Sequence, residues 1–210
     1  MPGKGSGADG VCGLLLAGGQ ARRMGGGDKC LQMLGGQTLL ARLVATLRPQ
    51  VSALVLNANG DPARFSCHDL PVAADVIDGF AGPLAGVLTG LEWARDHAPG
   101  CRWVASVACD APFAPRDLVA RLLAAVGDGK ADMACASSGG REHPVFGLWP
   151  VALAGDLRHA LVDDDIRKVD LWTARYRLAR ADWPVEPVDP FFNINRPEDL
   201  EAAEALLSSI

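Results

Sequence analysis

The first residues that could do chemistry lie in a glycine-rich segment near the N-terminus. Residues 16–29 read LAGGQARRMGGGDK and follow a short apolar run. Glycines let the backbone approach a ligand closely, and successive exposed N–H groups can cradle phosphate oxygens. Arg23 and Lys29 would add positive charge beside a triphosphate. The segment predicts a phosphate-binding loop, in which Lys29 makes few packing contacts; the alternative is a surface loop with incidental charges.

Two common phosphate-binding motifs do not fit this loop. A P-loop has glycine directly before its lysine and serine or threonine directly after it. Here Asp28 precedes Lys29 and Cys30 follows it. The dinucleotide fingerprint G-x-G-x-x-G needs a glycine where Gln20 stands. The sequence therefore disfavours both a P-loop NTPase and a dehydrogenase.

Three polar residues farther along the chain follow apolar segments and could meet the same ligand. Asp110 would suit Mg²⁺, because a carboxylate at the end of a strand is a hard oxygen ligand; its alternative role is to cap the helix that follows. Asn57 could bind a base edge or a ribose hydroxyl, or it could form an Asx turn before Asn59. The alternative for Asp75 is a polar strand end.

Other polar residues have structural interpretations that compete with functional ones. Asn193 and Asn195 are two apart, so in an extended segment they would point to one side and could hold a phosphate or a metal-bound water. A polar turn before the last helix is the alternative. His143 precedes a proline and is more typical of a structural residue. The acidic run 163–165 is interpreted as a solvated helix end.

These candidates must be positioned by alternating strands and helices. Apolar segments without polar alternation, typical of strands buried on both faces, lie at residues 11–17, 51–58, 72–77, 103–109, 132–136 and 145–149. Helices are expected at residues 39–47, 83–95, 115–126, 151–161 and 197–207, while residues 163–180 show a mixed pattern. The order predicts an α/β fold, with a doubly wound, mostly parallel sheet flanked by helices and ligands beyond the carboxyl ends of its strands.

Length and composition favour a single globular domain. The chain has 210 residues, of which 49% are hydrophobic and 21% charged, with no break in composition and no internal repeat. Residues 1–10 are expected to form a flexible tail and residues 11–210 the domain. A net charge of −5 disfavours a nucleic-acid partner. No apolar stretch reaches the roughly 18 residues that a membrane span requires.

The cysteines predict a reducing compartment. The chain has 6 cysteines, and no two of them form a C-x-x-C pair. Several lie in apolar runs, where a free cysteine acts as a small hydrophobic residue. The polar N-terminus also lacks the apolar region of a signal peptide. These features favour a cytoplasmic protein.

Taken in order, the motifs resemble those of the molybdenum cofactor guanylyltransferases, a branch of the molybdopterin nucleotidyltransferases. The loop 16–29 resembles their nucleotide loop, and sugar nucleotidyltransferases share that loop. The later matches are specific to the branch as an ordered set: NAN at 57–59, Asp75 with GPLAG at 82–86, CDAPF at 109–113, HP at 143–144 and FNINRP at 192–197. Arg196 stands where the family usually has threonine. The resemblance runs from residue 11 to about residue 207.

The resemblance implies a Rossmann-like nucleotidyltransferase fold and the transfer of GMP from GTP to Mo-molybdopterin. The products would be molybdopterin guanine dinucleotide cofactor and pyrophosphate. It further implies Mg²⁺ on Asp110, catalytic roles for Arg23, Lys29 and Asp110, and transient contacts with molybdoenzymes or cofactor-inserting proteins. The implied nucleotide-binding residues are Leu16, Ala17, Gly18, Gly19, Lys29, Asn57, Asp75 and Asp110.

Three other functions stay open. A molybdopterin cytidylyltransferase would share the fold, but its first loop typically reads LAAG, whereas residues 16–19 read LAGG. A sugar-phosphate nucleotidyltransferase would also share the fold. A non-catalytic carrier of the molybdenum cofactor belongs to a different class of protein, and the presence of Lys29 and Asp110 argues against it.

Overall fold

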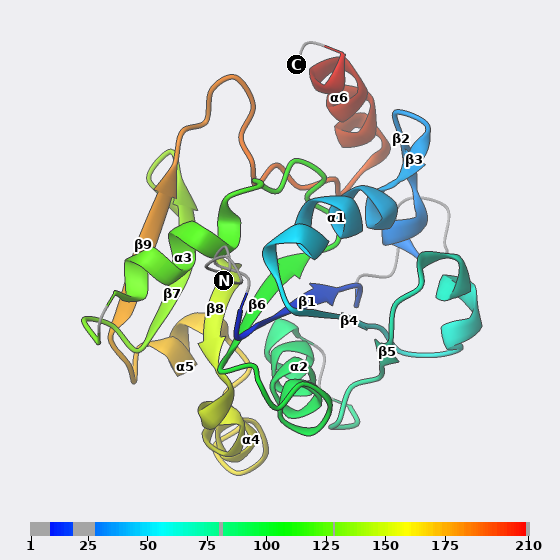
Figure 1. The fold of residues 1–210 in the computed structure, drawn as a ribbon. Coiled ribbons are helices and arrows are strands. Elements are labelled where there is room, and N and C mark those ends of the chain that lie inside the picture. The colour runs from blue at the N-terminus through cyan, green and yellow to red at the C-terminus, as the bar shows by residue number, and fades with distance from the viewer. Residues whose placement is uncertain (1–8, 19–27, 80–81, 128, 209–210) are drawn as a thin grey trace, which may run out of the picture.

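A central β-sheet organises the protein, as a computed structural model shows for residues 9–18, 28–79, 82–127 and 129–208. Within these ranges the sheet has seven strands in the order β5-β4-β1-β6-β8-β7-β9 (Figure 1). The strands are β1 (Val11–Leu16), β4 (Ala53–Asn57), β5 (Val72–Ala73), β6 (Trp103–Ala108), β7 (Met133–Ser138), β8 (Arg141–Pro150) and β9 (Leu178–Trp183). A separate hairpin pairs β2 (Met33–Leu34) with β3 (Gln37–Thr38).

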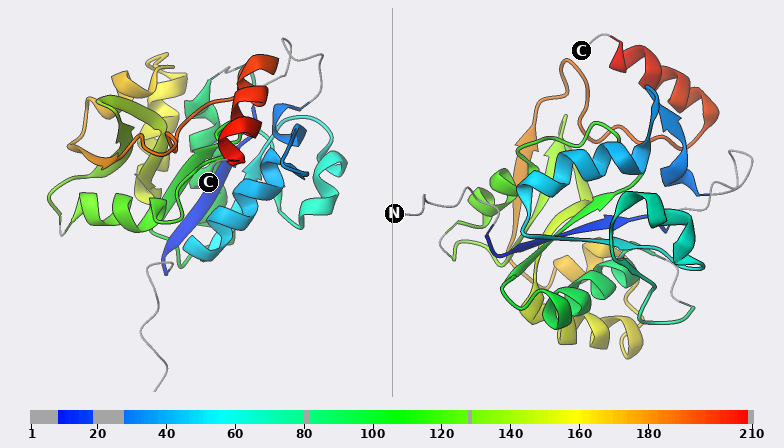
Figure 2. Two further views of the ribbon diagram at one scale, coloured as in Figure 1. Left: turned by 90° about the horizontal axis from the view of Figure 1, so that it is seen from above. Right: turned by 45° about the vertical axis from the view of Figure 1, so that its right-hand side comes forward.

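Helices cover both faces of the sheet. One face carries α1 (Leu39–Leu47) and α3 (Leu118–Val126), and the other carries α2 (Pro83–His97), α4 (Ala154–Val162) and α5 (Val169–Thr173) (Figure 1). The last helix, α6 (Pro197–Leu207), packs beside the β2–β3 hairpin (Figure 2). The 3₁₀ segments are η1 (Lys29–Leu31), η2 (Arg48–Gln50), η3 (Pro62–His68) and η4 (Val151–Leu153).

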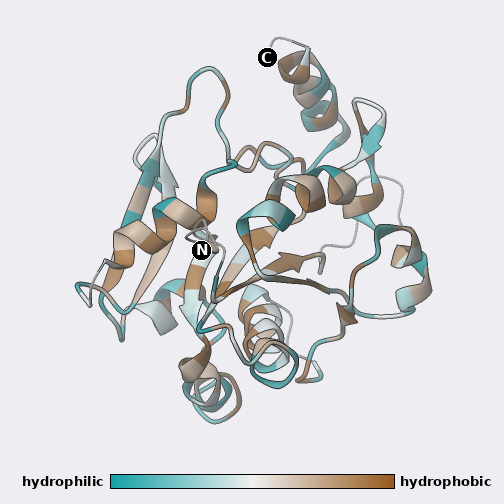
Figure 3. Ribbon diagram, viewed as in Figure 1, coloured by the Kyte–Doolittle hydropathy of each residue, from teal (hydrophilic) through white to brown (hydrophobic). Residues whose placement is uncertain are grey.

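The apolar strands are buried on both faces, as predicted. Leu14 and Leu15 are adjacent in β1 and both are 0% exposed, yet they belong to the cores on opposite faces. Successive side chains of a strand point to opposite faces, so a strand between two layers of helices must be apolar throughout. Figure 3 shows the corresponding hydrophobic colour along the central strands.

The sheet is mostly parallel, which confirms the predicted doubly wound class. β1 pairs in parallel with β4 and β6, β4 with β5, and β7 with β9. The exception is β8, which runs antiparallel to both β6 and β7. It spans Arg141–Pro150 and is thus longer than the predicted segment 145–149. β9 was not predicted, and β5 ends at Ala73 rather than at residue 77.

Two glycines let α2 pack closely on the sheet. A Cβ added at Gly86 would lie 2.5 Å from Leu16 Cδ2 and 2.5 Å from Asn57 Oδ1. One added at Gly90 would lie 2.5 Å from Leu14 Cδ2. Real Cβ atoms essentially never make contacts this short, so a side chain at either position would force these neighbours to shift. The helix thereby brings its N-terminus, which starts at Pro83, beside the ends of β1 and β4.

Specific hydrogen bonds fix the start of the sheet and the start of α1. The Gly10 carbonyl accepts from the Arg102 and Trp103 N–H groups over 2.8 and 3.2 Å, so the chain is tied to the sheet already before β1. Most of the predicted tail, residues 1–8, lies outside the described residues. Thr38 caps α1, because its Oγ1 accepts from the Ala41 N–H over 3.0 Å. In the described part of the chain, no helix combines the length and hydropathy needed to cross a membrane.

Candidate active site

A pocket opens where the parallel strands β1, β4, β5 and β6 end. Its volume is about 810 Å³, and it lies where doubly wound sheets bind their ligands. Of the residues predicted to bind nucleotide, it is lined by Leu16, Gly18, Asn57, Asp75 and Asp110. The Gly82–Pro83 turn at the start of α2 forms part of the wall. The ends of separate strands thus bring together residues that are distant in sequence.

The other predicted residues surround this pocket or lie outside the described part. The Ala17 N–H donates to the Asn57 carbonyl over 2.9 Å, which joins the ends of β1 and β4. Lys29 follows on η1 and reaches Asp110. Gly19 and Arg23 lie outside the described residues, so their predicted roles stay predictions.

Asn57 and Asp75 meet at one end of the pocket. Asn57 is 4% exposed, and its Nδ2 donates to Asp75 Oδ1 over 2.9 Å and to the Ala73 carbonyl over 3.2 Å. The Asn57 side chain is therefore committed to the next strand and its following turn, rather than to a local Asx turn. Asp75 is partly exposed in the pocket wall, where its carboxylate can still accept hydrogen bonds.

Asn59 also belongs to this end of the pocket, although it was not among the predicted site residues. Its Nδ2 donates to Asp75 Oδ2 and its Oδ1 accepts from the Asp75 N–H, both over 2.8 Å. The Arg64 guanidinium donates to the Asn59 carbonyl. The spacing in NAN could have indicated this, because residues two apart in an extended chain point to the same side, which would place Asn59 on the same side as Asn57.

Asp110 lines the pocket and pairs with Lys29, and this pair is called the charged end of the site. Lys29 Nζ lies 2.7 Å from Asp110 Oδ2 and 2.7 Å from Asn195 Oδ1. The Lys29 side chain is 12% exposed and that of Asp110 is 25% exposed. Lys29 is therefore anchored between two segments, in contrast to the expected loop lysine with few contacts. Asp117, not Asp110, occupies the position before α3, so Asp110 does not cap that helix.

The segment before α6 is fixed to this charged end. The Ile194 N–H donates to the Asp110 carbonyl over 2.8 Å, and Ile194 is fully buried. Both asparagines are exposed, and Asn195 Oδ1 accepts from Lys29 Nζ. The predicted asparagine pair thus contributes Asn195 to the site.

The N-terminus of α6 explains how Arg196 replaces the usual threonine. The Asp199 carboxylate accepts from the Asn195 N–H over 2.7 Å and from the Arg196 N–H over 2.9 Å. A carboxylate in the first turn of a helix satisfies free N–H groups and complements the helix dipole. This half of the cap uses the backbone N–H of residue 196, so it does not depend on whether arginine or threonine stands there.

Asp110 is a suitable ligand for a divalent cation that arrives with phosphates. Across the described ranges, no cluster of three or more His, Cys, Asp and Glu side chains could hold a metal by itself. Mg²⁺ in nucleotide enzymes is usually held by one or two carboxylates together with substrate phosphates and waters. A single carboxylate in the pocket wall fits that donor set.

His143 has the structural role that its sequence context favoured. It is 8% exposed, its Nε2 lies 2.8 Å from Ser138 Oγ, and its ring stacks on Phe191 with centroids 4.6 Å apart. Ser138 Oγ also donates to Asp189 Oδ1 over 2.9 Å. Burial lowers the pKa of His143, so the neutral ring is favoured. These contacts secure the segment that leads to Asn195.

The acidic run 163–165 is a solvated helix end, as interpreted from the sequence. Its three residues are exposed and lie at and just beyond the C-terminus of α4. Asp163 pairs with His159 over 2.6 Å, and Asp165 pairs with Arg167 over 2.8 Å. Such exposed pairs are typical of a surface.

Comparisons with known proteins identify relatives of this chain. The MobA-like NTP transferase domain matches residues 13–177. A molybdenum cofactor guanylyltransferase from Rhodopseudomonas palustris is 62% identical over 92% of this chain and 90% of its own length. The fold is similar to that of molybdopterin-guanine dinucleotide biosynthesis protein A from Archaeoglobus fulgidus, with a TM-score of 0.74, 23% identity and coverage of 95% and 100% of the two chains.

A Mycobacterium tuberculosis protein solved in complex with manganese shares the fold at a TM-score of 0.65 and 16% identity, covering 94% of this chain and 99% of its own. The likeness to the two solved structures concerns the fold. The domain match covers more than half of the chain, and the curated relative matches nearly all of it. The chain therefore belongs to the molybdenum cofactor guanylyltransferase family of MobA-like nucleotidyltransferases.

Proposed function

We propose that the protein transfers GMP from GTP to Mo-molybdopterin and releases pyrophosphate. The observation that carries this proposal is the pocket itself, whose wall contains an amide and carboxylate cluster and also Asp110, which pairs with Lys29. A nucleoside triphosphate has two parts that match these groups. Its neutral base carries N–H donors that suit the amide and carboxylate cluster, and its polyanionic chain suits the positive charge of Lys29. The guanylyltransferase relatives supply the identity of the base and of the acceptor.

Asp75 would contact the nucleoside, and Asn57, whose two amide N–H groups donate to Asp75 and Ala73, would support it. Asn57 is fixed by two hydrogen bonds and by the close approach of Gly86, so it changes little on binding. Asp75 offers carboxylate oxygens that can accept from N–H or hydroxyl groups. Leu16 and Gly18 line the same pocket, and Ala17 lies between them in the chain, so these residues would contact the nucleotide as well.

Lys29 would bind the phosphates and the leaving pyrophosphate. Its ammonium group is a compact charge with three N–H donors, so it can turn from Asp110 and Asn195 to phosphate oxygens. Arg23 and Gly19, in the glycine-rich segment, would contribute further donors. Negative charge builds on the leaving group in the transition state, and positively charged groups aimed there lower the barrier.

Asp110 would hold Mg²⁺, which would supply positive charge to offset the charge of the phosphates. The acceptor is a phosphate monoester, which is already largely ionised near neutral pH. The reaction therefore requires positioning and charge neutralisation more than a general base. We further propose a cytoplasmic location, where the 6 free cysteines stay reduced, and transient contacts with molybdoenzymes or cofactor-inserting proteins that receive the product.

The test is incubation with each labelled NTP, Mg²⁺ and molybdopterin, followed by identification of the product. We expect a guanine dinucleotide from GTP and a larger thermal stabilisation by GTP than by CTP or ATP. Formation of the cytosine dinucleotide would instead identify a cytidylyltransferase. Binding of molybdopterin without release of pyrophosphate would identify a carrier, and transfer only to sugar phosphates would identify a sugar nucleotidyltransferase.

Asp110→Asn tests the role of the charged end. Removal of the carboxylate charge should lower turnover by about 10²-fold or more, the scale seen when one key electrostatic group is lost. Asp163→Asn, in the solvated helix end, is the matched control and should leave turnover unchanged. Near-normal turnover of Asp110→Asn at saturating Mg²⁺ would refute the assignment.

A further inference from the structure

Two asparagine side chains hold the turn that carries Asp75. β5 ends at Ala73, so the strand itself stops short of Asp75. Asn59 meets Asp75 twice, through Nδ2 on the carboxylate Oδ2 and through Oδ1 on the backbone N–H, both over 2.8 Å. Asn57 donates to the other carboxylate oxygen over 2.9 Å. Each oxygen of Asp75 therefore has one fixed amide partner.

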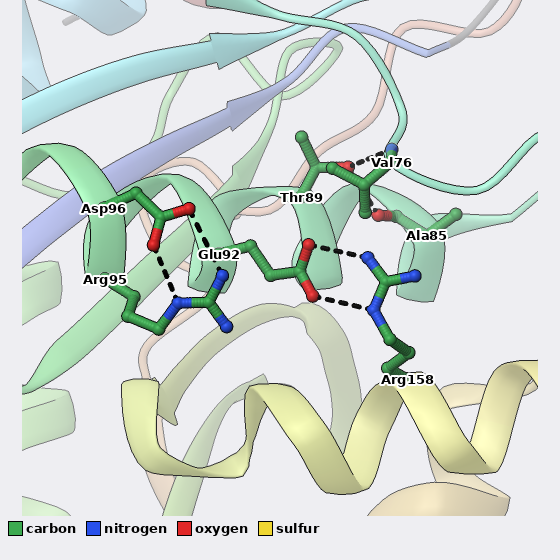
Figure 4. A network of polar contacts seen from close by, with 7 residues as sticks. All are labelled: Val76, Ala85, Thr89, Glu92, Arg95, Asp96 and Arg158. Atoms are coloured by element: carbon green, nitrogen blue, oxygen red, sulfur yellow. Dashed lines mark hydrogen bonds and ion pairs between the residues drawn. The ribbon is translucent and has the colours of Figure 1, made fainter.

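Thr89, on α2, fixes the next peptide group of the same turn. The Val76 N–H donates to Thr89 Oγ1 over 3.1 Å, and this hydroxyl donates to the Ala85 carbonyl over 2.9 Å (Figure 4). Thr89 is 1% exposed, so water does not readily replace this contact. Helix α2 is in turn tied to α4 by two parallel hydrogen bonds between Glu92 and Arg158, over 2.8 and 2.7 Å (Figure 4).

The orientation of Asp75 matters because of what a base presents to a carboxylate. Each carboxylate oxygen has two acceptor directions, and the asparagines use one on each. Guanine presents two adjacent N–H donors, at N1 and at the 2-amino group, which match the two remaining directions. Cytosine and adenine present a donor beside an acceptor, and the acceptor would face a negatively charged oxygen. A carboxylate held in one orientation therefore favours guanine.

We propose that Asn59 and Thr89 are positioning residues that fix the Asp75 carboxylate to read the paired N–H donors of guanine. The inference rests on the proposed guanylyltransferase function and adds the origin of nucleotide choice. Without these contacts the turn would have to be ordered when the nucleotide binds, which reduces affinity. Thr89 is the cleaner probe, because it contacts Val76 and Ala85 behind the wall of the pocket, whereas Asn59 lines the pocket itself.

The experiment compares GTP with ITP, which lacks only the 2-amino group. The wild type should prefer GTP over ITP by about 10- to 100-fold in kcat/KM and in Kd. This is the ratio expected when one hydrogen bond to a charged group is lost. Thr89→Val removes the hydroxyl at nearly constant volume, and Asn59→Ala removes the amide. Both should reduce the preference to about threefold or less, mainly through KM for GTP, because the lost contact is already made in the bound ground state.

Two matched variants serve as controls. Thr89→Ser keeps the hydroxyl and should retain the preference for GTP. Arg95→Gln removes the exposed ion pair with Asp96 on the same helix (Figure 4) and should also behave as wild type. Circular dichroism would show whether each variant is folded. If Thr89→Val does not fold, Asn59→Ala still tests the inference, because Asn59 is exposed and lies outside the core.

Equal losses with GTP and ITP in Thr89→Val and Asn59→Ala would overturn the inference, because a merely structural role predicts that result. So would a wild type that does not distinguish GTP from ITP. Failure of the proposed function would look different. In that case the wild type would form no guanine dinucleotide, while calorimetric Kd values for GTP and ITP would still report whether the positioning residues set the preference.

Discussion

The ion pair of Lys29 and Asp110 should stabilise the nucleotide-free protein, and the size of this effect follows from its burial. Two unit charges about 4 Å apart attract by about 4 kcal/mol at the effective dielectric constant of about 20 that applies near a protein surface. The free-energy costs of desolvating both charges and of ordering both side chains cancel most of this attraction. Exposed pairs contribute about 0.2–1 kcal/mol, whereas breaking a buried pair costs about 3–5 kcal/mol.

Lys29 and Asp110 lie between these limits, with side chains 12% and 25% exposed. We therefore expect Lys29→Met, which keeps most of the aliphatic stem, to lower the free energy of unfolding by about 1–2 kcal/mol. For a chain of this size, that corresponds to a decrease in Tm of about 2–8 °C. Turnover should fall by about 10- to 10³-fold, because the same ammonium group would bind the leaving pyrophosphate.

The assay is a double-mutant cycle by urea denaturation with Lys29→Met, Asp110→Asn and the double variant. The coupling free energy should be about 1–2 kcal/mol and should decrease in 1 M salt. Arg95→Gln with Asp96→Asn gives a matched cycle for a pair whose side chains are each 54% exposed, and its coupling should be smaller. A coupling below about 0.3 kcal/mol for Lys29 and Asp110, within the error of additivity, would refute the reasoning.

Two further predictions concern packing beside the pocket and the pH dependence of stability. Gly86→Ala should lower the free energy of unfolding by about 1–3 kcal/mol and weaken GTP binding, because its Cβ would meet Leu16 and Asn57 at 2.5 Å. Gly155→Ala, in a helix with open space around it, should instead be neutral or stabilising in the same denaturation assay. Burial lowers the pKa of His143 from its ordinary 6.5, so the unfolded state binds its proton first. Stability should therefore fall as pH decreases below about 6.5, and the dependence should be shallower in His143→Gln; equal slopes in urea denaturation series would contradict this.

The sequence predicted best those parts of the fold in which burial determines residue type. Leu14 and Leu15 had to be apolar because both faces of β1 are covered, so this strand stood out as an apolar run. β9 was missed because it lies at the edge of the sheet and mixes exposed and buried residues, such as Arg180 and Ala181. β5 was predicted too long, because the chain beyond Ala73 turns to meet side chains rather than a neighbouring strand.

In the candidate site, too, the sequence predicted some residues and missed others. Asn57 and Asp110 were recognisable because each polar residue ends an apolar strand, where a ligand is expected. The contact between Lys29 and Asn195 joins residues 166 positions apart, and neither spacing nor periodicity encodes such a pairing. Thr89 was hidden for another reason: a threonine within a buried helix face carries no signal that its hydroxyl receives an N–H from a distant turn.

The two ends of the pocket are connected by contacts between side chains outside the sheet. Asp28, directly before Lys29, pairs with Arg64 Nε over 3.2 Å, and the Arg64 guanidinium also donates to the carbonyl of Asn59. Asn59 in turn fixes Asp75. Arg64, on η3, thus contacts both Asp28, which precedes Lys29, and Asn59, which contacts Asp75. If a nucleotide meets Lys29 and Asp75 at once, as proposed, these contacts would reduce the cost of ordering the two residues separately when it binds.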